Sequence, residues 1–255
     1  MKQALIFTVI FAALQVAVST VAQLVWTLLL RQDGVMSTTA MIVTLSAFNV
    51  LAMVLFLATK WAVVSRHWVR TRPWAVLFWC VMAAFGVIVP SMWLQEHMPE
   101  LPNLMGEGIE ELMGSRVGYV VVGLLAPLVE ELVFRGAILR TLLKWHQNHW
   151  VAIALSAALF ALSHFNPAQM PHALLVGFLL GWMYYRTDSI VPGVVLHWVN
   201  NSVAYAVYNL SKAAYGTGDL TLAQLVGDER VLLAVGCSLL ILIPSLYQLN
   251  LRMKK

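Results

Sequence analysis

The hydrophobic positions of this chain fall in long runs without charge, rather than in alternating or one-sided patterns. Six such runs cover residues 3–30, 34–59, 73–95, 145–185, 189–211 and 231–251. A helix that crosses a bilayer needs about 20 apolar residues, so the run 145–185 holds two crossings, separated near Asn166-Pro167 and Pro171. Residues 117–139 form a further crossing, although they contain three charges. The pattern therefore predicts eight helices, over residues 4–30, 40–62, 74–94, 117–143, 150–165, 171–186, 190–209 and 231–250.

These runs predict the fold class of an all-α polytopic membrane protein. Only helices or closed barrels satisfy the backbone in lipid, and no alternating ten-residue pattern indicates a barrel. The composition agrees, because 60% of the 255 residues are hydrophobic and only 11% are charged. Loops are short, so we expect one transmembrane domain over residues 1–255, with about eight transmembrane helices enclosing an intramembrane polar cavity.

The basic residues predict the orientation of the helices. If the N-terminus is cytoplasmic, 11 of the 16 Lys and Arg residues lie in inner segments: Lys2, Lys60, Arg66, Arg70, Arg72, Arg140, Lys144, Arg186, Arg252, Lys254 and Lys255. Such a bias follows the positive-inside rule and places both termini in the cytoplasm. The net charge of +4 is then explained by orientation, and we expect the lipid bilayer and no nucleic acid as a partner.

Two features of the chain exclude other interpretations. The first hydrophobic run is too long for a signal peptide and lacks a small-residue cleavage site, so we expect a retained helix. Cys80 and Cys237 both fall in predicted crossings, which argues against a disulfide framework or a Cys-based zinc site.

Candidate chemistry begins with two adjacent glutamates in the fourth predicted helix. Glu130, Glu131 and Arg135 lie within the apolar stretch GLLAPLVEELVFRGAIL, residues 123–139. Ionisable groups at membrane depth are costly and indicate function by default. Residues four apart share a helical face, so Glu131 can pair with Arg135 while Glu130 turns elsewhere and is free to act as a base. A buried ion pair that only holds two helices together would give the same pattern.

Two further predicted helices each carry a histidine in a pair of residues with the same four-residue spacing. Phe160 and His164 lie in the fifth helix, and His197 and Asn201 lie in the seventh. With a rise of about 1.5 Å per residue, Glu130 and these polar residues fall about 10 to 20 Å from the cytoplasmic face. We therefore expect them to meet in one cavity.

Two neighbouring polar residues receive a different interpretation. Asn200 lies next to Asn201, so either side-chain amide could point into the cavity. The four-residue spacing from His197 favours Asn201. His172, near the outer end of the sixth helix, is expected at the membrane interface, with the mouth of the cavity as the alternative position.

These residue types favour hydrolysis of an amide. Glu130 would take a proton from water with the help of a histidine, while a second imidazole and Asn201 stabilise the oxyanion. A divalent metal such as zinc, held by Glu130, His164 and His197, would serve the same reaction. Neither HExxH nor GxSxG occurs in the chain. Both the metal-free and the metal-dependent reaction therefore stay open, and the metal-free reaction requires no cofactor.

The three segments resemble motifs of one family. Glu130 to Arg135 (EELVFR) resembles the EExxxR motif of the CAAX protease and bacteriocin-processing (CPBP) family of intramembrane endopeptidases, Phe160 to His164 its FxxxH motif, and His197 to Asn201 its HxxxN motif. The motif-bearing, CPBP-like core covers about residues 117–205. The resemblance implies an eight-helix fold similar to type II CAAX prenyl endopeptidases. It also implies that Glu130 is the water-activating residue, that His164, His197 and Asn201 are its catalytic partners, and that Glu131 and Arg135 support them.

The fold does not determine the substrate. We expect a membrane-associated protein or peptide, cleaved near the cytoplasmic side of a bacterial inner membrane. Two other classes of function stay open: a non-catalytic scaffold, immunity or regulatory factor with the same fold, and a transporter that uses the buried Glu, His and Arg as a proton relay.

Overall fold

A long central helix, interrupted by two π-helical stretches, organises the molecule. The computed structural model describes residues 1–32, 34–65, 73–104, 106–218 and 220–253. In it, residues 116–145 form one continuous helical column. Its successive segments are α6 (Arg116–Tyr119), the π-helical η2 (Val120–Leu125), α7 (Ala126–Val133), the π-helical η3 (Phe134–Leu139) and α8 (Arg140–Trp145).

The other long helices follow one another in antiparallel succession. They are α1 (Lys2–Leu24), continued by the π-helical η1 (Val25–Leu29), α2 (Thr38–Ala58), α4 (Trp74–Glu96), α9 (His149–Leu162), α10 (Met170–Thr187), α11 (Val191–Tyr215) and α13 (Val231–Arg252). Short elements join them: α5 (Gly106–Gly114), the 3₁₀ turn η4 (Pro167–Gln169), α12 (Leu222–Val226) and the 3₁₀ turn η5 (Asp228–Arg230).

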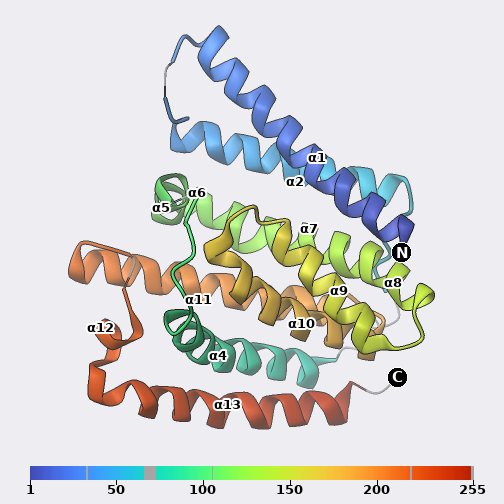
Figure 1. The fold of residues 1–255 in the computed structure, drawn as a ribbon, viewed down its shortest axis with the longest axis vertical. Coiled ribbons are helices and arrows are strands. Elements are labelled where there is room, and N and C mark those ends of the chain that lie inside the picture. Colours follow the sequence, from blue (N-terminus) through green and yellow to red (C-terminus); the bar gives the residue numbers. More distant parts are fainter. Residues whose placement is uncertain (33, 66–72, 105, 219, 254–255) are drawn as a thin grey trace.

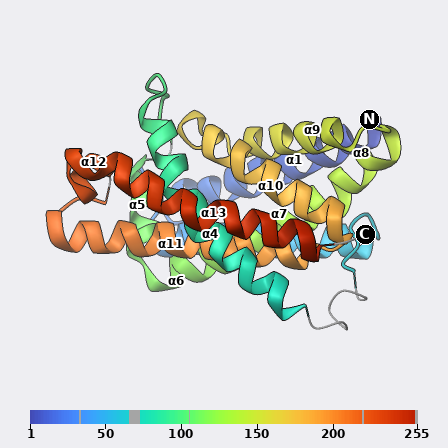
Figure 2. The same ribbon diagram turned by 90° about the horizontal axis from the view of Figure 1, so that it is seen from below.

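The helices form three groups in space. In Figure 1, α1 and α2 lie along one side, α4 and α13 along the opposite side, and the central column lies between them with α9, α10 and α11. Figure 2 shows α13 crossing α4, and these two helices pack directly on each other. The column contacts α1, α2, α9, α10 and α11, so its middle is enclosed by helices from both halves of the chain.

The predicted fold class is confirmed. Each of the eight predicted helices is present, with ends within a few residues of the predicted ends except that α11 extends six residues further, and the described residues contain no strand. Within the described parts of the chain, five helical stretches are long and apolar enough to cross a membrane: Lys2–Leu29, Thr38–Ala58, Trp74–Glu96, Arg116–Trp145 and Asp228–Arg252. The shorter α9 and the more polar α10 and α11 do not meet the same standard, so eight crossings stay a prediction.

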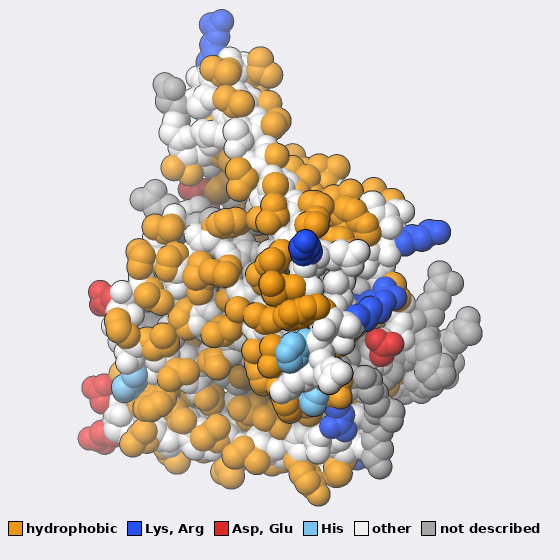
Figure 3. Space-filling view, turned by 45° about the vertical axis from the view of Figure 1, so that its right-hand side comes forward, with side chains coloured by type: hydrophobic (Ala, Val, Ile, Leu, Met, Phe, Trp, Pro, Cys, Tyr) orange, Lys and Arg blue, Asp and Glu red, His pale blue; other side chains and the backbone are white. Residues whose placement is uncertain are grey.

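The surface has the character expected of a protein in lipid. Figure 3 shows a face covered largely by hydrophobic side chains, with most acidic side chains toward its left edge and most Lys and Arg toward its right. Both chain ends lie at the same end of the bundle (Figure 1). The Arg186 guanidinium at the end of α10 donates to the backbone of Asn250 and Met253 near the end of α13. Which end faces the cytoplasm stays a prediction, and Arg66, Arg70, Arg72, Lys254 and Lys255 lie outside the described residues.

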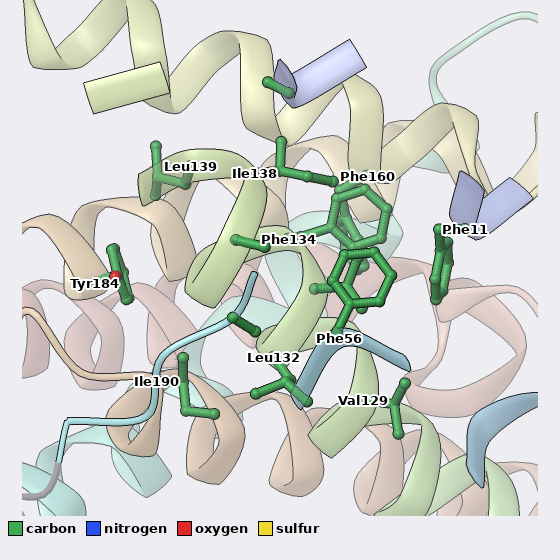
Figure 4. Close-up of a cluster of buried hydrophobic side chains, with 14 of the residues drawn as sticks. Phe11, Phe56, Val129, Leu132, Phe134, Ile138, Leu139, Phe160, Tyr184 and Ile190 are labelled. Carbon is green, nitrogen blue, oxygen red and sulfur yellow. The ribbon is translucent and has the colours of Figure 1, made fainter. Parts of the chain in front are cut away.

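Aromatic packing anchors the central column against its neighbours. The ring of Phe134 lies edge-on to Phe11 of α1, at 5.4 Å between centroids, and to Phe160 of α9, at 5.2 Å. Figure 4 shows Phe134 and Phe160 side by side within this cluster of buried side chains. Where α9 meets α10, a β-carbon added to Gly177 would lie 3.3 Å from Ala157, so the small residue permits close approach of the two backbones. This packing fixes the faces of α7, α9 and α10 that carry the polar residues.

Candidate active site

The two adjacent glutamates occupy different environments on α7. The side chain of Glu131 is fully buried, whereas that of Glu130 is 22% exposed. Arg135, one turn later in η3, donates from Nη1 to Glu131 Oε1 at 2.8 Å. The pairing expected from the four-residue spacing is therefore present.

Arg135 is itself fully buried and makes two further contacts. Its Nη2 donates to the carbonyl oxygen of Gly177 in α10 at 3.0 Å. Its guanidinium carbon lies 4.6 Å from the centroid of the Phe160 ring, a cation–π contact. The guanidinium thus joins the central column to both α9 and α10 and neutralises Glu131.

His197 connects the two glutamates across the α7–α11 interface. Its Nδ1 lies 3.2 Å from Glu131 Oε1, and its Nε2 lies 3.6 Å from Glu130 Oε2. A carboxylate paired with arginine only accepts hydrogen bonds, so the Nδ1–H group donates to Glu131. In the neutral imidazole, Nε2 then carries a lone pair that faces Glu130. Among the described residues, His197 is the titratable side chain placed to exchange a proton with Glu130.

A close approach of α11 supports this arrangement. A β-carbon added to Gly193 would lie 2.6 Å from Glu131 Oε2, an oxygen that accepts no hydrogen bond from the described residues. Only glycine leaves room for the buried carboxylate at this point of α11. Gly193 was not identified from the sequence, where one glycine in an apolar run carries no signal of its own.

His164 differs from its predicted setting. The fifth helix was expected to extend to residue 165, but α9 ends at Leu162 and His164 lies in the turn that follows. Its Nδ1 donates to the carbonyl oxygen of Phe160 at 2.9 Å, and its ring lies edge-on to the Phe160 ring at 4.8 Å. The next residue, Phe165, has a φ of 51°, which is incompatible with a continuing α-helix.

The Phe160 ring brings the two motif histidines to one aromatic side chain. His197 also lies edge-on to it, at 5.7 Å. His164 makes no hydrogen bond to Glu130, His197 or Asn201 within the described structure. In the neutral imidazole its Nε2 carries a lone pair, because the ring proton lies on Nδ1 and is donated to the Phe160 carbonyl oxygen.

Asn201 lies one helical turn after His197 and is held by other groups. Its Nδ2 donates to the carbonyl oxygen of Val122 in η2 at 3.0 Å, and its Oδ1 accepts from Asn200 Nδ2 at 3.2 Å. Asn200 is the more buried of the two amides, at 5% exposure. The structure therefore brings Glu130, Glu131, Arg135 and His197 into direct contact, and places His164 and Asn201 beside this group without direct contact.

Two polar residues make contacts that sequence reasoning did not predict. The Nδ1 of His172 lies 2.6 Å from Ser91 Oγ on α4, and its Nε2 lies 3.2 Å from Asn200 Nδ2. Its expected place at the membrane interface stays a prediction. Ser91 is 4% exposed and was not singled out at all. These partners are distant in the sequence, so no local spacing could have revealed them.

The arrangement does not fit the predicted metal site of Glu130, His164 and His197. Among the described residues, no three His, Cys, Asp or Glu side chains come close enough together to hold a metal ion. His197 approaches Glu130 but already donates from Nδ1 to Glu131, and His164 bonds to a backbone carbonyl instead. Of the three predicted metal ligands, the described structure brings Glu130 and His197 together and leaves His164 apart from them.

Comparison with known proteins addresses the same part of the chain. Residues 113–203 match the family model described as type II CAAX prenyl endopeptidase Rce1-like. This segment is similar to the Rce1-like family. The match confirms the resemblance seen in the motifs, since the Rce1-like segment contains Glu130, His164, His197 and Asn201.

A curated relative matches over a limited length. The chain is 32% identical over 79 residues to UPF0177 protein YxdF of Lactococcus lactis subsp. lactis (strain IL1403). The aligned part covers 30% of this chain and 42% of the relative's own length. No solved structure matches the chain. The Rce1-like segment therefore shows what the middle of the chain is similar to, while the activity of the whole protein is a matter for proposal.

Proposed function

We propose that this protein is an intramembrane endopeptidase that hydrolyses a peptide bond of a membrane-associated protein or peptide near the cytoplasmic side. The observation that carries the proposal is the division between the two glutamates. Glu131 is fully buried and paired with Arg135, whereas Glu130 retains exposure and faces His197 Nε2. One carboxylate is a structural anion, and the other is available as a base.

The reaction begins with removal of a proton from water by Glu130. The resulting hydroxide attacks the carbonyl carbon of the scissile amide, and its oxygen stays on the acyl product. Glu130 then delivers the proton to the leaving nitrogen as the C–N bond breaks. Water is thereby divided between the two products, so no other reactant is needed.

The histidines and Asn201 assist at two points. His197 Nε2, 3.6 Å from Glu130 Oε2, is placed to share the proton, and catalytic contacts of this length commonly shorten when substrate binds. His164 supplies a second unoccupied Nε2. One N–H group of Asn201 remains after its bond to Val122, and a donor of this kind stabilises the oxyanion of the tetrahedral intermediate.

The first experiment identifies the substrate. Membrane proteins and secreted peptides are compared between cells that express the wild-type chain and cells that express Glu130→Gln, which removes the base with little change of shape. The matched control is Glu229→Gln, which makes the same chemical change at an exposed position in η5. We expect new C-termini with the wild type and the control, and none with Glu130→Gln.

The second experiment tests the mechanism on the peptide so found. With purified protein in detergent, Glu130→Gln should lower kcat by about 10²-fold or more. Cleavage at the wild-type rate by Glu130→Gln would overturn the assignment of the base. Absence of any difference among the three cell lines would favour the alternative, a non-catalytic scaffold, immunity or regulatory factor.

A further inference from the structure

A second chain of polar contacts lies beside the proposed site and reaches across four helical elements. It runs from Ser91 on α4 through His172 on α10 to Asn200 and Asn201 on α11, and ends at the Val122 carbonyl in η2. None of the reaction steps above uses Ser91, His172 or Asn200. Polar side chains at membrane depth are costly unless they are partnered, so this chain needs a physical explanation.

The direction of each hydrogen bond follows from the side chains. Asn200 Nδ2 can only donate, so His172 Nε2 accepts from it and the imidazole proton lies on Nδ1. That Nδ1–H group donates to Ser91 Oγ. The second N–H group of Asn200 donates to Asn201 Oδ1. Asn200 is therefore turned so that both of its donors are used, while its Oδ1 is buried and accepts no hydrogen bond from the described residues. This orientation and the Nδ1–H form of His172 require each other.

The orientation of Asn200 affects the orientation of the Asn201 amide. The oxygen and nitrogen of an asparagine amide have nearly the same shape, so packing alone does not decide which one faces a substrate. Only the N–H side can stabilise an oxyanion, and the oxygen side would repel it. At Asn201, the donor on Asn200 and the acceptor on Val122 together select one of the two orientations.

We propose that His172 and Asn200 are positioning residues that hold the amide of Asn201 with its N–H side available for the oxyanion. This inference rests on the proposed endopeptidase function and deepens it. His172 acts through Asn200, without touching the substrate. These hydrogen bonds require the neutral Nδ1–H tautomer of His172, which Ser91 stabilises by accepting from Nδ1.

A purely structural role would link α4, α10 and α11 through the same contacts, so the test compares three substitutions. His172→Phe keeps an aromatic ring but removes the acceptor for Asn200. His172→Gln places an amide oxygen close to the position of Nε2 and keeps the acceptor. His149→Phe is the matched control, because His149 stacks on Tyr185 at 4.1 Å, away from the polar chain, and Phe preserves the stacking.

The measurements are kcat, KM and thermal stability in the same detergent, with the cleaved peptide as substrate. We expect His172→Phe to lower kcat by about tenfold with KM within about twofold, because a misplaced oxyanion donor weakens the transition state and leaves ground-state binding intact. His172→Gln should recover most of kcat, and His149→Phe should match the wild type. Wild-type kcat in His172→Phe, or equal losses of kcat and stability in His172→Phe and His172→Gln, would overturn the proposal.

A second experiment does not depend on peptide cleavage, so it tests the positioning role independently of the proposed function. In protein labelled with ¹⁵N-histidine, the ring of His172 should carry its proton on Nδ1, and Asn200→Leu should change the Nε2 resonance. A proton on Nε2 in the wild type would overturn the positioning role whatever the activity. Cleavage that is insensitive to Glu130→Gln would instead refute the proposed function.

Discussion

His197 donates from Nδ1 to Glu131 Oε1 at 3.2 Å, on the same carboxylate oxygen that accepts from Arg135. The buried glutamate is therefore more than the partner of an arginine, since it also fixes the ring orientation of a histidine on another helix. That orientation turns Nε2 toward Glu130. Glu131 and Glu130 thus act on opposite nitrogens of one imidazole.

Substitutions of His197 should separate its two nitrogens. In His197→Asn the amide nitrogen replaces Nδ1 and keeps the bond to Glu131, while the group that faces Glu130 is lost. We expect kcat to fall by about 10²-fold with thermal stability close to that of the wild type. His197→Ala should lower both. Retention of full activity by His197→Asn would show that Nε2 plays no part in the reaction.

Removal of the arginine should destabilise the fold. Arg135→Met leaves Glu131 buried without a guanidinium partner, and breaking a buried ion pair in this way costs about 3–5 kcal/mol. The double variant Arg135→Met, Glu131→Gln should recover part of this loss, because no unpaired charge remains. Thermal unfolding in detergent compares the stability of the wild type, the single variant and the double variant. Arg230→Met, at an exposed position, is the control. Equal stability of the single and double variants would contradict the ion-pair argument.

Gly193 provides a steric test of the site. In Gly193→Ala the new methyl carbon would lie 2.6 Å from Glu131 Oε2, so the carboxylate must shift and draw His197 with it. We expect a loss of kcat of about tenfold or more, since a displacement of about 1 Å at a catalytic group is costly. Gly236→Ala on α13 is the control, because an added β-carbon there meets no other atom within 4 Å. The prediction would be wrong if both variants cleaved the peptide at equal rates.

Metal removal tests the chemistry assigned to the carboxylate. The described residues do not gather three metal-binding side chains, so we expect the rate of peptide cleavage to be unchanged after dialysis against a strong chelator. Restoration of a lost rate by added zinc would instead revive the site of Glu130, His164 and His197. The comparison needs protein whose metal content has been measured before and after dialysis.

The sequence predicted the features that depend on local spacing. Uncharged runs located seven of the eight helices, because a span of lipid demands about 20 apolar residues in succession, and the eighth was a similar apolar stretch that contains three charges. The Glu131–Arg135 pair followed from the four-residue repeat of a helical face. Motif spacing also marked the segment that matches the family model.

Features that depend on tertiary contact were not accessible in this way. The end of α9 before His164 reflects a single left-handed residue at Phe165, which carries no sequence signal. The contact between Ser91 and His172 joins residues 81 positions apart. The bond from Arg135 to Gly177 uses a backbone carbonyl that every residue possesses, so the choice of acceptor depends on how α10 packs.

The π-helical stretches η2 and η3 flank the glutamates on both sides. A π-helical turn contains one residue more than an α-helical turn, and each residue of an α-helix advances the chain by about 100°. Deleting one residue from 123–125 would turn α6 and the Val122 carbonyl relative to Glu130, even if every side chain named above were kept. The geometry of this site thus depends on how many residues precede the glutamates as well as on which residues they are.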